Sequence, residues 1–118
     1  MFNRNEVRLL GRVSNVSIKT GSKGKYAIVT VATNEAYKDK NDEWQQSATF
    51  HRVTTFSKSL VEKLEKKVSV GDLIDVEARL QNNSREKDGD TVYYIDIVAT
   101  RIGIVAYKAE KTEERDAA

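Results

Sequence analysis

The sequence predicts an all-β domain, a five-stranded barrel with one short helix between its third and fourth strands. Five segments rich in β-branched and aromatic residues recur along the 118 residues, and such residues favour extended chain. One segment alone has apolar residues at helical spacing, and glycine-containing or polar turns separate the strands. We expect residues 1–107 to form one domain with a modest core, and residues 108–118 to form a charged, disordered tail.

The first two strands are expected at residues 6–18 and 26–34. Apolar residues alternate in one phase up to Val13 and in the opposite phase from Val16, which predicts a bulge or sharp bend near Ser14. Residues 21–25 predict a basic hairpin tip and lack the spacing of a Walker phosphate loop. The second strand is apolar on both faces, so we expect a central position for it.

Residues 35–46 are polar and predict a loop or a hairpin tip. Tyr37 and Trp44, the only tryptophan, lie at either side of its most polar part. An aromatic ring in so polar a segment has two explanations: it covers the core, or it stacks on a ligand. The sequence leaves both open.

The third strand, residues 48–56, is the most informative segment. Alternation along a strand places Phe50, Arg52 and Phe56 on one face, with His51 and Val53 on the other. Two aromatic rings that flank a guanidinium suit stacking on nucleic-acid bases together with a phosphate contact. The alternative is a core face from which Arg52 extends to the rim.

The helix is expected within residues 57–70, where leucines and valines recur at helical spacing. Ser59 and Glu62 match a capping box, and Gly71 can end the helix. Residues 73–80 predict the fourth strand, with its even-numbered apolar side chains, including Leu80, directed inward. Residues 82–90 predict a polar connection, and residues 91–107 the last strand, with a bend at Gly103.

Three strands, a helix and two strands follow the order of the OB-fold. This fold commonly binds single-stranded nucleic acid across its second and third strands and their loops. Tyr37 and Trp44 lie in the connection between these strands, and Phe50 and Phe56 lie on the third. The aromatic residues are therefore where that use of the fold needs them.

The amino-acid composition excludes several classes of function. The absence of cysteine excludes disulfides, Cys-rich zinc sites and thiol nucleophiles, and the single histidine lacks partners for a catalytic triad, so we expect no enzyme, metal or cofactor. No apolar run approaches the roughly 18 residues of a membrane span, and residues 1–4 do not begin a signal peptide, which predicts a cytoplasmic protein. A net charge of +2 requires any nucleic-acid site to be a local basic patch.

Several segments resemble the bacterial-type single-stranded DNA-binding proteins. They are NEVRLLGRV at 5–13, VATNE at 31–35, TFHRV at 49–53, FSK at 56–58 and VGD at 70–72. The resemblance implies sequence-independent binding and protection of single-stranded DNA during replication, recombination or repair, in association with the nucleoid. It also implies a homo-oligomer, a tetramer in preference to a dimer.

The resemblance also implies roles for individual residues. Those expected on DNA, the aromatic ones by base stacking and the cations through the backbone, are Tyr37, Trp44, Phe50, Phe56, Arg52 and Lys58. His51 matches a residue at the subunit interface, and a core histidine in a monomer is the alternative. From their positive charge we also expect phosphate contacts at Arg4 and at the lysines at 23, 25, 38 and 40.

The sequence departs from the family pattern in three places. The Asp-Pro-Glu segment after the first strand is replaced by Ser-Asn-Val-Ser at 14–17. A further stacking tryptophan is missing near Arg85, which we expect to stack there instead. The acidic, Phe-terminated tip is also missing, so tip-mediated recruitment of replication and repair enzymes does not carry over. The alternative function is an accessory protein of replication restart, recombination, a plasmid or a phage that binds DNA and a protein partner.

Overall fold

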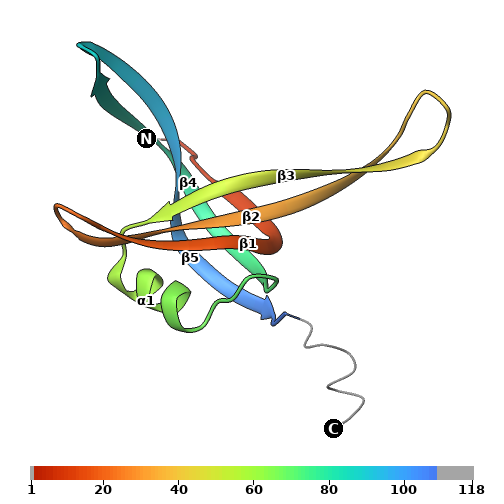
Figure 1. Cartoon of the computed structure of the whole chain (residues 1–118), viewed down its shortest axis with the longest axis horizontal. Coiled ribbons are helices and arrows are strands. Elements are labelled where there is room, and N and C mark those ends of the chain that lie inside the picture. The colour runs from red at the N-terminus through yellow and green to blue at the C-terminus, as the bar shows by residue number, and fades with distance from the viewer. Residues whose placement is uncertain (1, 109–118) are drawn as a thin grey trace, which may run out of the picture.

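The computed structural model describes residues 2–108 and contains five strands and one helix. The elements are β1 (Val7–Gly21), β2 (Gly24–Lys38), β3 (Trp44–Thr55), α1 (Lys58–Lys66), β4 (Leu73–Lys87) and β5 (Asp90–Ala106). The strands close a barrel in the order β1-β2-β3-β5-β4 (Figure 1). The predicted OB-fold is thereby confirmed. No helix among residues 2–108 is long and apolar enough to cross a membrane.

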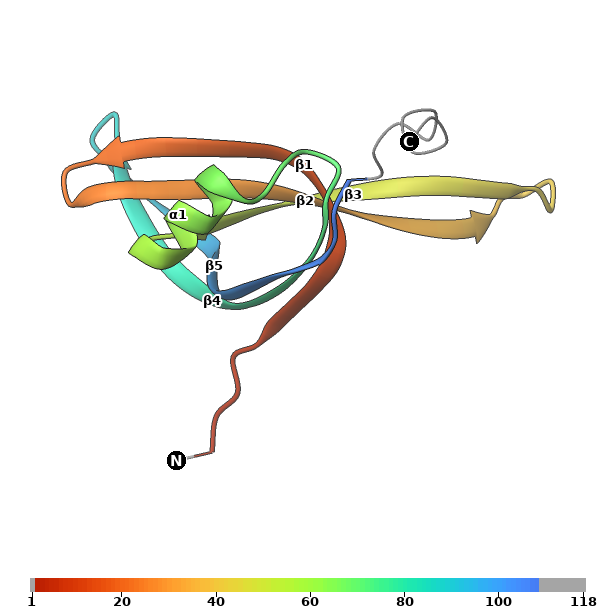
Figure 2. The same ribbon diagram turned by 90° about the horizontal axis from the view of Figure 1, so that it is seen from below.

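The core lies inside the barrel and is made of β-branched side chains from every strand. Val29, Val31 and Val53 are fully buried, as are Ile74 and Val76. Helix α1 packs against β1 and β2 (Figure 2) and inserts Val61 and Leu64 at 4% and 1% exposure. A fully buried aliphatic side chain of this size contributes roughly 1.5–3 kcal/mol. The helix is therefore held by its apolar face, as its spacing predicted.

Two hairpins project from the barrel as long arms (Figure 1). The β2–β3 hairpin is paired without interruption from Ala27↔Thr55 to Lys38↔Trp44, and the β4–β5 hairpin is paired out to Lys87↔Asp90. The loops predicted at residues 35–46 and 82–90 were therefore too long. Their polar side chains do not prevent pairing, because an antiparallel hairpin satisfies its own backbone donors and acceptors in solvent.

Irregular positions shape the strands. The register of β1 against β2 shifts between Val13 and Asn15, which confirms the predicted bulge. On β5 the pairing skips Thr100 and Val105, whereas Gly103 pairs regularly with Asp75. The bend expected at Gly103 is thus replaced by two bulges beside it. Bulges increase twist and let a small sheet close into a barrel.

The helix differs from prediction at both ends. Ser57, not Ser59, is the N-cap, and it makes no side-chain capping bond, so the predicted capping box is wrong. Glu62 instead accepts a hydrogen bond from Lys66 at 3.0 Å, which lowers the pKa of Glu62 and raises that of Lys66. The helix ends at Lys66, and Gly71 adopts φ +100° in the turn before β4.

Two further expectations concern β4 and the tail. Leu80 was expected to face the core but is 45% exposed, because it lies where β4 leaves the barrel for its arm. The tail predicted at 108–118 lies outside the described residues, apart from Lys108. The backbone N–H of Lys108 donates to the buried carboxylate of Asp72 at 2.5 Å, which fixes the exit of β5 beside the turn before β4.

Candidate nucleic-acid interface

The outward face of β3 carries aromatic and basic side chains. Val53 and Thr55 point into the core at 0% and 1% exposure, whereas Phe50 and Phe56 are 62% and 61% exposed. Arg52 is exposed between them. The core-face explanation of this strand is therefore wrong, since packing buries the Val53 face and leaves the Phe50 face in solvent.

A groove of about 590 Å³ lies beside this face. Strands β3 and β5 pair in parallel at only two positions, Val53↔Ile97 and Thr54↔Val98. Beyond them the β2–β3 and β4–β5 hairpins diverge (Figure 1), and the groove lies between their bases. Its lining residues are Lys19 from β1; Tyr26 and Ile28 from β2; Arg52, Thr54 and Phe56 from β3 and the residue after it; and Asn83, Arg85, Ile95, Asp96 and Ile97 from the other hairpin.

Aromatic and cationic groups lie together in this groove and at its edge. The rings of Tyr26 and Phe56 lie 5.8 Å apart at 35° to each other, and the Arg85 guanidinium lies 5.6 Å from the centre of the Tyr94 ring. Exposed aromatic rings and the flat guanidinium groups of arginine are platforms that suit the π-face of any base. Lys19, Arg52 and Arg85 supply positive charge around them. The groove can therefore hold bases and phosphates together.

The β2–β3 arm continues the aromatic face. Trp44 and Phe50 are an even number of residues apart on β3, so both share the outward face of the hairpin. Trp44 is 68% exposed, and the Lys38 ammonium lies 5.4 Å from its ring. The turn at the tip of this arm is held by Asp39. Its carboxylate accepts hydrogen bonds from the backbone N–H groups of Asn41 and Glu43 at 2.8 and 3.0 Å. The backbone bond from Glu43 is the main cause of the lowered pKa of Asp39.

Tyr37 lies on the other face of the same arm. It pairs with Gln45, one register step from the Lys38↔Trp44 pair, and is 52% exposed. His51 shares the Tyr37 face, is half-buried, and hydrogen-bonds Thr33 through Nε2 at 2.9 Å. The structure thus separates Tyr37 from the Trp44 and Phe50 rings that the resemblance grouped with it.

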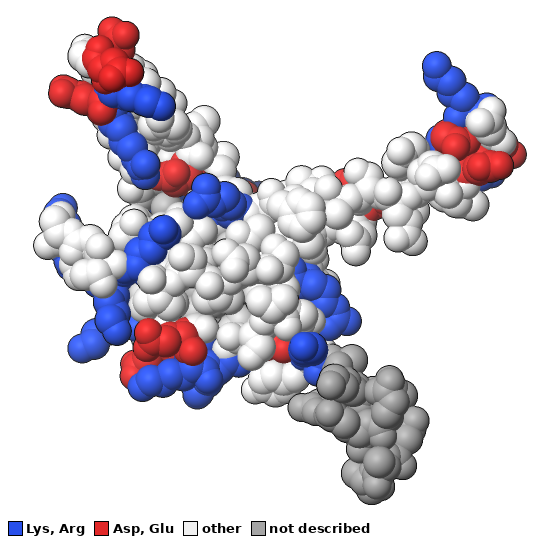
Figure 3. All heavy atoms as spheres, in the orientation of Figure 1, with Lys and Arg blue, Asp and Glu red and all other residues white. Residues whose placement is uncertain are grey.

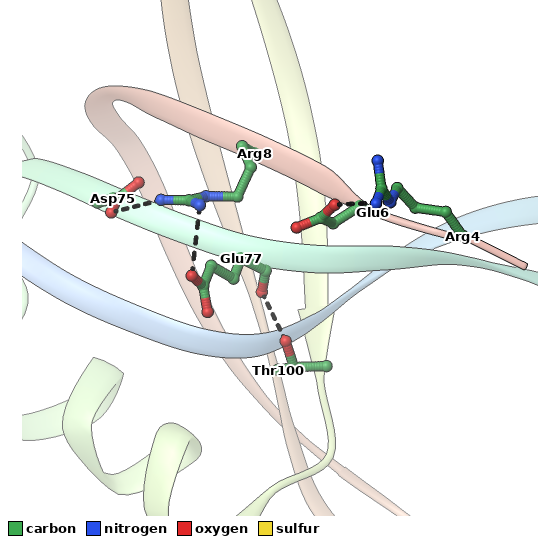
Figure 4. Close-up of polar contacts among 6 residues, drawn as sticks. All are labelled: Arg4, Glu6, Arg8, Asp75, Glu77 and Thr100. Atoms are coloured by element: carbon green, nitrogen blue, oxygen red, sulfur yellow. Dashed lines mark hydrogen bonds and ion pairs between the residues drawn. The ribbon is translucent and has the colours of Figure 1, made fainter.

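Lys58 and Arg4 lie away from the main groove. Lys58 begins α1 and lines a second groove of about 480 Å³ with Lys23 and Lys25 of the β1–β2 tip; Phe56 lies in both grooves. Arg4 precedes β1 and pairs with Glu6 at 3.9 Å (Figure 4). Of the twelve residues predicted on DNA, the main groove brings together Arg52, Phe56 and Arg85.

The structure also adds groove residues that sequence reasoning missed. They are Lys19, Tyr26, Ile28, Thr54, Asn83, Ile95, Asp96 and Ile97. Alternation outward from buried Ala27 and Val29 could have identified Tyr26 and Ile28 as surface residues. The residues of the β4–β5 hairpin gave no such signal, because only the barrel closure brings this hairpin beside β3.

The outer surface of β1 and β4 has a different character (Figure 4). The Arg8 guanidinium lies 3.4 Å from Asp75 and 3.5 Å from Glu77, and the Thr100 hydroxyl donates to the Glu77 carbonyl at 3.1 Å. Arg8 is thus matched by two carboxylates, whereas no ion pair within 4.0 Å involves Lys19, Arg52 or Arg85 among residues 2–108. The three cations of the main groove therefore have no carboxylate partner within that distance in the described part of the chain.

The acidic side chains in view gather away from the centre of the molecule. Figure 3 shows red atoms mainly at the tips of the two long hairpins and over α1, with basic side chains around the largely uncharged body between them. A net charge of +2 therefore hides an uneven distribution. Such local fields, not bulk charge, attract a polyanion.

An OB-fold barrel with an open, aromatic and basic groove defines a class of oligonucleotide-binding domain. The chain belongs to the single-strand binding protein family, whose sequence profile matches residues 4–105. It is 33% identical over 98 residues to the single-stranded DNA-binding protein of Rickettsia felis, a match that covers 80% of this chain and 64% of that protein. The chain thus spans less than two thirds of that relative's length.

Other comparisons agree on family and fold. The single-stranded DNA-binding protein of Aquifex aeolicus is 29% identical over 118 residues, covering 93% of this chain and 80% of the relative. Among solved structures, the Plasmodium falciparum SSB complex with ssDNA superposes with a TM-score of 0.72 at 22% identity. That match covers 89% of this chain and 97% of the other. At that identity the structural likeness establishes the fold.

Proposed function

We propose that this chain binds and protects single-stranded DNA without sequence preference, in replication, recombination or repair. The observation that carries the proposal is the exposed aromatic face of β3 beside a groove with unmatched cations. Stacking supplies affinity that tolerates any base, because every base presents a π-face, and cations along the track bind the backbone. Membership in the single-strand binding family supports the same activity.

The proposed track runs from the β2–β3 arm into the main groove and on to α1. Trp44, Phe50 and Phe56 stack bases along it, and Arg52 and Arg85 hold phosphates in the groove. Lys58 extends it into the second groove. Tyr37 and Arg4 remain predictions, since Tyr37 lies on the far face of the arm and Arg4 outside both grooves.

Titration with oligo-dT tests the proposal directly. The chain has one tryptophan, Trp44, which is 68% exposed on the proposed track, so its fluorescence reports contact without labelling. We expect saturable quenching that weakens as salt is raised. An unlabelled competitor of mixed sequence should reverse it. Absence of binding at low salt by both fluorescence and gel shift would refute the proposed function.

We further propose that the chain forms a homo-oligomer, a tetramer in preference to a dimer. Residues 7–11 of β1 pair with β4 on one side, and no other strand within residues 2–108 pairs with their second edge. Leu10, 58% exposed, and Val105, 57% exposed, lie on the same outer surface. An unpaired edge beside exposed apolar side chains favours strand pairing with another copy. His51 is proposed at an interface between subunits.

We propose binding without catalysis, in the cytoplasm and with the nucleoid. The family relatives are DNA-binding proteins by name. Within residues 2–108 no group of three or more acidic or histidine side chains is arranged to hold a metal ion. The chemistry that the groove offers is stacking and charge pairing, which needs no cofactor.

A further inference from the structure

One carboxylate lies in the otherwise basic groove. Asp96 lines it beside Lys19, Arg52 and Arg85. Its Oδ2 accepts a hydrogen bond from the side-chain amide of Asn83 at 3.1 Å, across the β4–β5 hairpin. A carboxylate repels phosphate, so its presence on a DNA track requires an explanation. The Asn83 bond fixes its orientation and leaves its other oxygen free to accept.

The position of Asp96 relative to Arg52 is set by the sheet. Val53 pairs with Ile97 and Thr54 with Val98, so Arg52 and Asp96 each lie one residue before the paired segment, on facing strands. They nevertheless form no ion pair within 4.0 Å, and no described cation pairs with Asp96. The groove therefore presents a separate cation and a separate acceptor beside the short β3–β5 pairing.

These two groups divide a nucleotide between them. Arg52 would attract the phosphate and Asp96 would repel it, so a strand bound in the groove would turn a base edge, not its backbone, toward Asp96. We propose that Asp96, oriented by Asn83, accepts a hydrogen bond from a base amino group at this one subsite, above all from cytosine, and so adds a weak local preference over thymine to binding that is otherwise independent of sequence. This inference rests on the proposed function and adds a specificity-determining residue to the same site.

The chemistry of the bases gives the direction of the preference. An ionised carboxylate only accepts hydrogen bonds, and the N4 amino group of cytosine is a donor that acidic side chains recognise. Thymine presents O4 at the same place, and an acceptor facing a carboxylate leaves both groups unsatisfied. Because stacking is indifferent to the base, the preference is modest and confined to this subsite.

Asp96→Asn is the matched change. It keeps the shape of the side chain and an oxygen for Asn83 but adds an NH2 donor, which thymine O4 can accept. Affinities for oligo-dC and oligo-dT of about 15 nucleotides, near the site size of an OB-fold, are compared in the parent and the variant. We expect the dC-to-dT affinity ratio to fall roughly fivefold in the variant, the net effect of one hydrogen bond made at a solvent-exposed site.

Asp90→Asn is the control for charge. Asp90 is exposed at the tip of the same hairpin and outside the groove. Both variants lose one negative charge, so both should bind all oligonucleotides somewhat more tightly. Only Asp96→Asn should change the ratio. A structural role for Asp96 would alter stability but leave the ratio at the parent value.

A second measurement uses the unmodified protein. An oligomer of N4,N4-dimethylcytosine stacks but has no amino donor, so the parent should bind it roughly fivefold more weakly than oligo-dC. Equal affinity for these two oligomers, or an unchanged ratio in Asp96→Asn, overturns the inference while leaving the proposed function intact. If the parent binds none of the oligonucleotides, the proposed function itself fails and the inference fails with it.

Discussion

Whether a side chain of this barrel faces the core or the solvent depends on whether its position in the strand is odd or even. On β3, Val53 and Thr55 pack in the core, whereas Phe50 and Arg52, at even-numbered positions of the same strand, are exposed to solvent. The same rule puts Tyr37 on the face opposite Trp44, although both are exposed aromatics of one arm. A shared arm is therefore not a shared binding surface. Substitutions at these positions should show the difference.

Replacing Phe56 by Ala should weaken oligo-dT binding by about 1–3 kcal/mol, the usual effect of removing one stacking ring. Phe56 is 61% exposed and lies in both grooves, so the change should leave the core unaltered. Fluorescence titration of Trp44 measures the affinity. Tyr107→Ala, which removes a ring of 69% exposure outside both grooves, is the control and should bind like the parent. Equal affinities for the two variants would exclude Phe56 from the track.

Replacing Arg52 by Ala should reduce the dependence of affinity on salt. Each phosphate neutralised on a single strand contributes a slope of about −0.7 in log affinity against log salt, so the variant should lose about that much. Arg8→Ala is the matched control, because Arg8 is already paired with Asp75 and Glu77. Its slope should equal the parent's. If Arg52→Ala keeps the salt dependence of the parent protein, Arg52 does not contact a DNA phosphate.

At the scale of elements, hairpins do two different jobs. Their bases close the barrel and form the groove, while their outer parts are paired only to themselves and lie in solvent. Stability of the arms therefore depends on turns and cross-strand pairs, and stability of the barrel on packing. A substitution that destabilises an arm should therefore leave the stability of the barrel nearly unchanged, and the reverse should also hold.

Asp39→Asn should loosen the tip of the β2–β3 arm without unfolding the barrel. The pKa of Asp39 lies below its ordinary 3.8, first because it accepts the Glu43 backbone N–H. A carboxyl with a lowered pKa stabilises the fold above its ordinary pKa and ceases to do so as pH falls through the lowered value. In the parent, protection of the Asn41 and Glu43 amides should therefore be lost below about pH 3.8. Hydrogen exchange followed by NMR measures it.

Asp42→Asn is the control for that change. Asp42 is an exposed carboxylate of the same turn with φ 61°, a conformation that asparagine tolerates, and it pairs with Lys38 at 3.4 Å. We expect normal protection of the tip in this variant. If both variants exchange alike, the hydrogen bonds to Asp39 do not hold the turn.

Gly11→Ala should destabilise the barrel by roughly 1–3 kcal/mol, the range for overpacking. A Cβ at this point of β1 would overlap the Ala32 carbonyl oxygen of β2, and a backbone atom cannot move aside cheaply. Gly103→Ala on β5 meets nothing within 4 Å and should be neutral or stabilising. Denaturant unfolding of both variants checks the contrast; equal stabilities would show that β1 and β2 separate easily at Gly11.

At the scale of the molecule, the two arms and the barrel leave surfaces that one copy does not cover. The second edge of β1 at residues 7–11 has no strand partner within residues 2–108, and exposed Leu10 and Val105 lie beside it. A barrel of this size holds only a short length of single strand, so several copies would lengthen the track and raise avidity. Assembly and DNA binding should therefore be linked.

His51→Lys tests the assembly. If His51 lies at an interface, a permanent charge there should favour smaller species on dilution, because the charge would be buried near its own symmetry copy. Sedimentation velocity over a range of concentrations measures the change. Lys40→His, at the exposed β2–β3 tip, controls for the exchange of these two residue types. An unchanged oligomer in His51→Lys places His51 outside the interface, and a monomeric parent removes the assembly proposal.

Much of this molecule follows from local sequence. Alternation predicted the faces of β1 and β3, and the phase change near Ser14 predicted its bulge, because side-chain direction along a strand is a property of the strand itself. Helical spacing located α1 for the same reason. The resemblance suggested that Arg85 stacks in place of a missing tryptophan; Arg85 lines the groove with its guanidinium over Tyr94, and its stacking on a base stays a prediction.

Other features were decided only by the tertiary structure. Polarity at residues 35–46 and 82–90 does not distinguish a loop from a solvated hairpin, because pairing in water depends on the partner strand and not on burial. Nor does the sequence show that Asn83 and Asp96 face Arg52, since they become neighbours only through the short parallel pairing of β3 with β5. The sequence by itself thus determined the order and faces of the strands. Closure of the barrel decided which faces meet across the groove, because contacts between distant segments have no local periodicity to reveal them.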